Sequence, residues 1–151
     1  MSVAFRRDSD EEHLEPKFEL PLPPGPNLVT ARGLAKISAK VADLNAALAQ
    51  ATDDPTCATI NRDLRYWRAR ETTATLAPIP SGETVAFGTC VTFTLNNATR
   101  TITIVGSDEA DPAQDDITFT APLARAMMGL SMGECADFNG LEDAIEIIAI
   151  T

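Results

Sequence analysis

Residues 31–74 read ARGLAKISAKVADLNAALAQATDDPTCATINRDLRYWRARETTA and contain two runs in which side chains recur at alternating spacings of three and four. The first run consists of Leu34, Ile37, Val41, Leu44 and Leu48, and the second of Cys57, Ile60, Leu64, Trp67, Glu71 and Ala74. This heptad spacing is typical of a helix that packs one face against another helix. Because the break between the runs is a short turn at Thr52-Asp53-Asp54-Pro55, they predict an antiparallel helical hairpin with arms about 30 Å long. Thr30 is the predicted cap of the first helix.

The segment before the hairpin, residues 1–26, has a different composition. It combines an acidic run over residues 8–12 with a cluster of prolines toward its end. These are Pro16, Pro21, Pro23, Pro24 and Pro26. Proline at this density blocks helices and sheet ladders, and the segment has too little apolar surface to offset the entropy of ordering. The segment is therefore predicted to be a disordered tail, with the alternative that Phe5, Phe18 and Leu20 anchor it on a partner.

From about residue 78 the apolar period becomes two, which is typical of half-buried strands. The alternating residues are Val85 and Phe87, then Val91, Phe93 and Leu95, then Ile102 and Ile104, and finally Ile117 and Phe119. Asn96-Asn97 supplies one turn, and Asn139-Gly140 is a strong hairpin signal before a closing strand over residues 144–150. Pro122 opens a short helix that Gly129 ends.

Together these patterns predict an α+β protein with three parts. Residues 1–26 are the tail, residues 27–77 an antiparallel coiled-coil hairpin, and residues 78–151 a small antiparallel sheet packed against one short helix. The 151-residue chain has a net charge of −10, which divides into −3, +2 and −9 over these parts. The hairpin is thus the only part whose charge suits an approach to phosphate, whereas the acidic C-terminal part is suited to binding protein.

The cysteine and histidine content excludes several functions. Cys57, Cys90 and Cys135 lie far apart and form no C-x-x-C pair, so neither a disulfide framework nor a zinc site is expected. His13, the single histidine, lies in the predicted tail, which disfavours catalysis by a histidine base. The sequence shows no apolar run long enough to span a bilayer and no signal-peptide core. We therefore expect a cytoplasmic protein that binds no membrane.

Asp53 and Asp54 lie at the predicted tip of the hairpin and have two interpretations. Two carboxylates at the end of a projecting rod can share a Mg²⁺ ion with an outside ligand, because Mg²⁺ prefers carboxylate oxygens. Alternatively, an Asp before Pro55 is ordinary turn chemistry, in which the side chain accepts hydrogen bonds from nearby backbone N–H groups. The residues alone favour the turn.

Arg62, Arg65 and Arg68 recur every three residues and so lie along one side of the second predicted helix. We call these three residues the arginine face. The face can follow a phosphate backbone or an acidic channel wall. The alternative is a solvated helix surface paired with neighbours such as Asp63, and such surface pairs contribute little stability.

Three stretches of the chain carry a family resemblance. They are PNLVTARGL at residues 26–34, VAFGTCV at 85–91, and IVGSDEAD at 104–111, the last followed by Ile117 and by PLARA at 122–126. They resemble the bacterial Gre transcript-cleavage and elongation factors, of GreA and GreB type. The first stretch resembles the family's entry to its first helix, the second its first strand of the C-terminal domain, and the third its signature. The Pro-rich tail is more similar to GreB-type members.

The resemblance implies a protein that acts on bacterial RNA polymerase and is not itself an enzyme. In that family the hairpin enters the secondary channel, where tip carboxylates help to hold a second Mg²⁺ ion, and an FKBP-like C-terminal domain docks on the polymerase outside it. Carried over to this sequence, the docking residues are Asp108, Glu109, Asp111, Thr120, Pro122 and Arg125. The resemblance implies a monomer without a cofactor of its own, whose arginine face meets the channel or nascent RNA.

Two departures from the family bear on activity. The family tip has a D-x-x-E pattern, whereas this chain offers Asp53-Asp54-Pro55, and each arm is shorter by roughly 10 residues, about 15 Å at helical rise. Thr120-Ala121-Pro122 also replaces the common Asp-Ser-Pro of the docking region. We therefore expect a polymerase-binding regulator of elongation that cleaves RNA poorly or not at all. The alternatives are a true cleavage factor that uses Asp53 and Asp54, and an FKBP-like interaction or chaperone module unrelated to polymerase.

Overall fold

The computed structural model describes residues 19–151, which form two compact units. Unit 1 comprises the described residues up to Pro24 together with Ser38–Thr72, and unit 2 comprises Gly25–Ile37 and Thr73–Thr151. Residues 1–18, which include most of the predicted tail and His13, lie outside the described residues. Within residues 19–151, no helix is long and apolar enough to cross a membrane.

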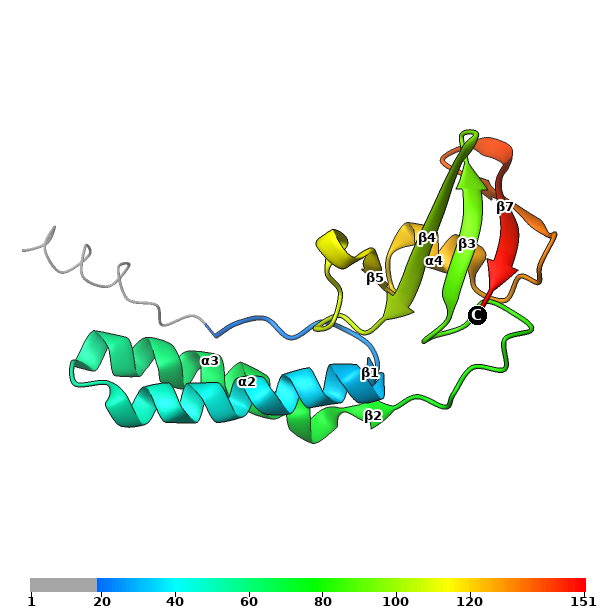
Figure 1. Ribbon diagram of the computed structural model, residues 1–151. Helices are drawn as coiled ribbons and strands as arrows, with labels where there is room; N and C mark the ends of the chain where they lie inside the picture. Colours follow the sequence, from blue (N-terminus) through cyan, green and yellow to red (C-terminus); the bar gives the residue numbers. More distant parts are fainter. Residues whose placement is uncertain (1–18) are drawn as a thin grey trace, which may run out of the picture. The chain divides into compact units, whose positions relative to one another are not determined.

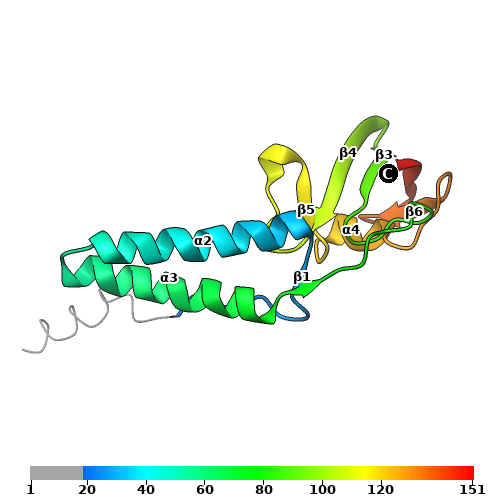
Figure 2. The ribbon, with the colours of Figure 1, turned by 60° about the horizontal axis from the view of Figure 1, so that its bottom comes forward.

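The predicted helical hairpin is confirmed. It consists of α2 (Ala31–Gln50) and α3 (Asp54–Thr73), which run side by side in opposite directions (Figures 1 and 2). All residues of the two heptad runs are buried or half-buried, whereas most positions between them are exposed. Thr30 caps α2 as expected, because the Gly33 N–H donates to Thr30 Oγ1 at 2.9 Å. A pair of helices covers only one face of each, so the contact is a narrow seam.

Two short strands at the base of the hairpin were not predicted. β1 (Leu28–Val29) pairs in parallel with β2 (Thr75–Leu76), and the Thr75 and Ala77 N–H groups donate to the carbonyls of Asn27 and Val29. Two residues are too few to display a period of two, so the sequence pattern could not reveal them. Through this pairing, residues 27–37 and 73–77 belong to unit 2, although the sequence grouped them with the hairpin.

Unit 2 contains a five-stranded sheet in the order β5-β4-β3-β7-β6. The strands are β3 (Cys90–Leu95), β4 (Ala98–Val105), β5 (Asp116–Thr118), β6 (Cys135–Phe138) and β7 (Leu141–Ile150). The prediction of an antiparallel sheet is wrong at one edge, because β5 pairs with β4 in parallel. The connection over residues 106–115, which includes the short helix η1 (Pro112–Gln114), turns the chain back so that β5 starts opposite Thr103 and runs in the same direction as β4. The sheet is therefore mixed.

The core of unit 2 lies between the sheet and α4 (Pro122–Met127), as the sequence predicted. Its buried residues are Val85, Val91, Phe93, Ile102, Ile104, Ala124, Met127, Ile145 and Ile147. The two predicted turns are also present, with positive φ at Asn96, Asn97, Asn139 and Gly140. These turns match the β3–β4 and β6–β7 hairpins. The fold class is α+β.

The strand expected at Val85 and Phe87 is absent. Both side chains are buried, but the backbone makes only an isolated bridge at Thr84 and then turns. Thr89 Oγ1 accepts from the Ala86 N–H at 3.0 Å and closes that turn. The apolar alternation at Val85 and Phe87 therefore predicted their burial correctly, but its prediction of a regular strand is wrong.

Gly106 generates a stability prediction, because a Cβ at this position would overlap the carbonyl oxygen of Leu28. Gly106→Ala must push the β1 backbone away, and we expect a loss of about 1–3 kcal/mol in the free energy of unfolding. Urea denaturation followed by far-UV circular dichroism measures it. Gln114→Ala, a control at an exposed position of the same connection, should change stability by less than about 0.5 kcal/mol. Equal stability of Gly106→Ala and the parent chain would contradict the close approach.

Candidate functional site

A buried carboxylate joins the signature loop, residues 106–115, to the first turn of α2. The Glu109 side chain is 2% exposed, and both of its oxygens accept hydrogen bonds: Oε1 from Thr30 Oγ1 at 2.5 Å and Oε2 from Arg32 Nε at 2.5 Å. Arg32 Nη2 also donates to Asp116 Oδ2 at 2.8 Å. We call Thr30, Arg32, Glu109 and Asp116 the clamp, and all four belong to unit 2.

The clamp satisfies the charges that it buries. The hydrogen bond to Glu109, followed by the charge of that carboxylate, raises the pKa of Arg32 and keeps the guanidinium charged. Thr30 serves both sides, since its hydroxyl accepts from Gly33 and donates to Glu109. A Cβ at Gly33 would lie 2.6 Å from Glu109 Oε1, so the glycine permits the close approach. The clamp thus holds the signature loop in place, and both oxygens of the Glu109 carboxylate are already used within it.

The predicted docking residues fall into two groups. Glu109 is buried in the clamp, and the Asp111 carboxylate caps η1 by accepting from the Ala113 N–H at 3.0 Å. Asp108 is half-buried and also takes part in an interaction within the chain. By contrast, Thr120, Pro122 and Arg125 are all exposed. Pro122 and Arg125 are three residues apart on α4 and share one side of that helix. The exposed group, which we call the α4 surface, is therefore the part suited to contact a partner.

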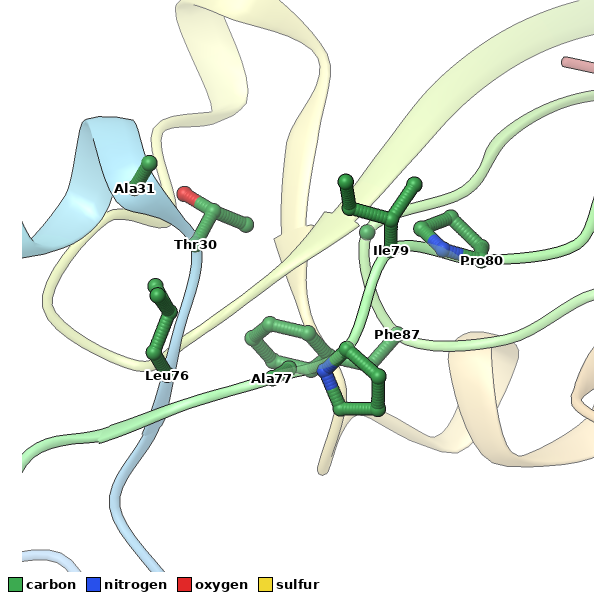
Figure 3. Close-up of a pocket in the computed structure, with 9 residues that line it drawn as sticks. Thr30, Ala31, Leu76, Ala77, Ile79, Pro80 and Phe87 are labelled. Carbon is green, nitrogen blue, oxygen red and sulfur yellow. The ribbon is translucent and has the colours of Figure 1, made fainter.

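A cavity of about 280 Å³ also lies in unit 2, close to the clamp. Figure 3 shows Thr30 and Leu76 on one side of it and Ile79, Pro80 and Phe87 on the other. None of its lining residues has an ionisable side chain. The cavity can accommodate an apolar group, but it provides no acid or base.

At the hairpin tip, the structure supports the turn interpretation of Asp53. Its Oδ2 accepts from the Thr56 N–H at 3.0 Å and so caps α3. Hydrogen bonds from the Thr56 side chain and then from its backbone lower the pKa of Asp53. Asp54 is exposed in the first turn of α3, where a negative charge is favourable. Among residues 19–151 no group of three or more His, Cys, Asp or Glu residues is placed to hold a metal ion.

Each residue of the arginine face has a partner within unit 1. Arg62 pairs with Asp63 at 3.1 Å, and Arg68 donates to Asn45 at 2.8 Å. Arg65 donates to both carboxylate oxygens of Glu19, at 2.6 and 2.7 Å. The structure therefore leaves the face on the surface but engages its charges within the chain.

Arg32, Asp116 and Glu19 were not among the functional residues predicted from the sequence. Arg32 and Asp116 are 84 residues apart, and no periodicity connects positions so distant. One signal was available, because Gly33 is an isolated glycine in a helical pattern and such a glycine often marks a close approach. The sequence pattern did not identify the Glu109 carboxylate as the group that approaches Gly33.

Comparison with known proteins relates the C-terminal part of this chain to one family. Residues 80–151 match the family model described as "Transcription elongation factor, GreA/GreB, C-term". A protein named Transcription elongation factor GreA from Maricaulis maris is 38% identical over 61 residues, which are 39% of this chain and 39% of that protein. One of the same name from Leuconostoc mesenteroides is 39% identical over 72 residues, 44% of this chain and 45% of that protein. The chain thus matches less than half of the length of these curated relatives.

Two solved structures are also similar. The prokaryotic transcription elongation factor GreA/GreB from Nitrosomonas europaea is 17% identical, covers 85% of this chain and 99% of its own, and superposes with a TM-score of 0.40. GreA factor homolog 1 (Gfh1) of Thermus thermophilus is 14% identical, covers 84% of this chain and 99% of its own, and has a TM-score of 0.38. These similarities are too low to transfer the role of any residue.

The clamp generates a second stability prediction. Arg32→Met keeps the aliphatic stem but leaves the buried carboxylates of Glu109 and Asp116 without a cation. Removing one partner of a fully buried pair costs about 3–5 kcal/mol, and because the Arg32 side chain is 58% exposed we expect about 2 kcal/mol. Urea denaturation at neutral pH measures the loss, with the exposed Arg125→Met as the matched control. Equal stability of the two variants would show that the clamp does not support unit 2.

The Asp53 cap predicts a pH dependence in the acid range. Because the pKa of Asp53 is lowered in the folded chain, its stabilisation of the α3 terminus is complete above the unfolded pKa and is lost as pH falls through the folded pKa. Amide hydrogen exchange at Thr56 reports the cap directly. Asp53→Ala should accelerate this exchange at neutral pH, whereas Asp53→Asn should keep the protection and lose its acid dependence. Unchanged exchange in Asp53→Ala would rule out the cap.

Proposed function

We propose that this chain binds bacterial RNA polymerase and regulates elongation without cleaving RNA efficiently, because its residues 80–151 match the C-terminal domain of the GreA/GreB family of transcription elongation factors. This family match is the observation that supports RNA polymerase as the partner. The chain acts as a monomer in the cytoplasm, has no cofactor of its own, and alters the properties of the polymerase instead of catalysing a reaction itself.

The C-terminal domain provides the docking contact in this proposal. Thr120, Pro122 and Arg125 form an exposed α4 surface, and the clamp holds the adjoining signature loop in a single arrangement. Residues 78–151 carry a net charge of −9, which suits a basic protein surface and disfavours nucleic acid. Glu109 does not contact the polymerase, because its carboxylate is already occupied. It acts instead by positioning the loop.

The short hairpin supports the second half of the proposal. Each helix has 20 residues and so extends about 30 Å. The carboxylate of Asp53 is engaged by its own helix, and a ligand to a catalytic metal must lie at bonding distance from it. The hairpin therefore occupies the mouth of the secondary channel and competes there with longer factors. The arginine face lies along the channel wall or the nascent RNA.

One observation favours a second candidate, a true transcript-cleavage factor. Asp54 is exposed at the tip, so its carboxylate is accessible to a Mg²⁺ ion already held by the polymerase. Cleavage stimulated by this chain and abolished by Asp54→Ala would establish that candidate. A module unrelated to polymerase is disfavoured by the family match of residues 80–151.

A backtracked polymerase distinguishes these functions. We expect no shortened RNA when this chain is added to the stalled complex, and reduced cleavage when it competes with a full-length Gre factor. Shortened RNA that disappears in the Asp53→Ala/Asp54→Ala variant would contradict the proposal. A chain that neither binds the polymerase nor blocks cleavage would contradict both candidates.

The α4 surface has its own test in the same assay. Arg125→Glu should weaken polymerase binding about tenfold or more, because it removes the cation of the α4 surface and leaves the anion that this cation pairs with in the proposed contact facing a like charge. The matched control is Arg100→Glu on β4, which makes the same charge change in the same unit and should bind normally. Equal affinity of the Arg125→Glu and Arg100→Glu variants would contradict a docking contact at α4.

A further inference from the structure

The chain already places one of its own carboxylates on the arginine face. Arg65 donates from Nε and Nη2 to the two oxygens of Glu19, at 2.6 and 2.7 Å, so the guanidinium binds the carboxylate side by side. Arg62 pairs with the adjacent residue on its own helix, whereas the partner of Arg65 comes from 46 residues earlier in the sequence. Both Glu19 and α3 at Arg65 belong to unit 1.

The contact extends beyond this ion pair. Glu19, Leu20 and Leu22 line a shallow groove of about 210 Å³ together with Arg65, Tyr66 and Ala69. The segment Glu19–Leu22 thus brings an acidic residue and two leucines to the same stretch of α3. Prolines at 21, 23 and 24 restrict its backbone, which lowers the entropy lost when it lies extended on the helix.

The pair is charged at neutral pH but weak. The hydrogen bonds from Arg65 lower the pKa of Glu19, and those to Glu19 raise the pKa of Arg65. Each side chain is 56% exposed, however, and exposed ion pairs are screened by water and salt. A contact of this strength is readily exchanged for another anion of similar geometry.

We propose that Glu19–Leu22 is an intramolecular strap that masks Arg65, and that an acidic segment of a partner protein reaches the arginine face only by displacing it. The inference rests on the proposed function, which gives the arginine face a role in binding. The segment that lies against Arg65 and lines the groove is a carboxylate followed by Leu-Pro-Leu, so the arginine face is matched to an acidic and apolar peptide segment better than to an RNA phosphate. The apparent affinity of the partner for the arginine face is then its intrinsic affinity multiplied by the fraction of chains in which the strap is open.

The first measurement detects the strap in the free, full-length chain. Phenylglyoxal modifies accessible arginines, and mass spectrometry gives its rate at each residue. Glu19→Gln should increase the rate at Arg65 and leave the rate at Arg68 unchanged. The matched control is Asp43→Asn, which removes one negative charge from an exposed position of α2 and should change neither rate. An unchanged rate at Arg65 in Glu19→Gln would show that the strap does not form in solution and would overturn the proposal.

The second measurement asks whether the strap competes with a partner. Glu19→Gln should bind bacterial RNA polymerase about twofold to fivefold more tightly than the parent chain, as expected for the loss of one exposed ion pair, and Asp43→Asn should bind normally. A single-stranded RNA oligonucleotide forms the second arm and should show no such gain. A gain confined to RNA would overturn the proposed peptide partner.

The two readouts separate the strap from the proposed function. Faster modification of Arg65 with unchanged polymerase affinity would overturn masking while leaving the proposed function intact. Faster modification with no polymerase binding by any variant would overturn masking of a polymerase contact and the proposed function together. Arg65→Glu should reduce binding, because the new carboxylate faces the acidic segment of the partner. High salt should screen this repulsion and restore part of the lost affinity, and a loss that salt does not change would contradict an acidic partner.

Discussion

The buried carboxylate of Glu109 is the constraint on which unit 2 depends. A carboxylate that is 2% exposed is stable only if both oxygens are satisfied and a cation is near, and the first turn of α2 supplies Thr30 and Arg32 for this purpose. The same requirement explains Gly33, whose missing side chain makes room for the carboxylate oxygen. It also ties residues 27–37 to the C-terminal domain rather than to the hairpin. The acidic signature loop is therefore a structural element of unit 2, and in the proposed function the exposed α4 surface is the part that contacts a partner.

Local engagement of charge is the common property of the hairpin. Asp53 is used by its own helix terminus, Arg62 and Arg68 by neighbours, and Arg65 by Glu19. The contacts of Arg65 and Arg68 are exposed, whereas the Arg62–Asp63 pair is half-buried, and exposed pairs of this kind contribute little stability. In the proposed function, this hairpin occupies a channel of the polymerase and performs no chemistry within it. The net charge of −10 conceals this division between an acidic body and a basic rod.

Much of the fold could be predicted from the sequence, and the failures have physical causes. The heptad runs, the Thr30 cap, the Asn-Asn and Asn-Gly turns and the α4 helix after Pro122 are local patterns, and all are present. The parallel β4–β5 pair and the β1–β2 pair depend on where a connection returns the chain, which periodicity does not encode. The candidate site was predicted less well. Glu109 was found by its motif but assigned to docking, because its burial depends on Arg32, 77 residues away.

The central claim is that this chain meets RNA polymerase through the α4 surface of its C-terminal domain. Site-specific photo-crosslinking tests it most directly, with a photoreactive amino acid placed at Arg125 and, as a control, at Arg100. The account predicts that the probe at Arg125 crosslinks to a polymerase subunit in the assembled complex and that the probe at Arg100 does not. Crosslinks from Arg100 alone, or none from either position under conditions where the chain binds, would contradict it.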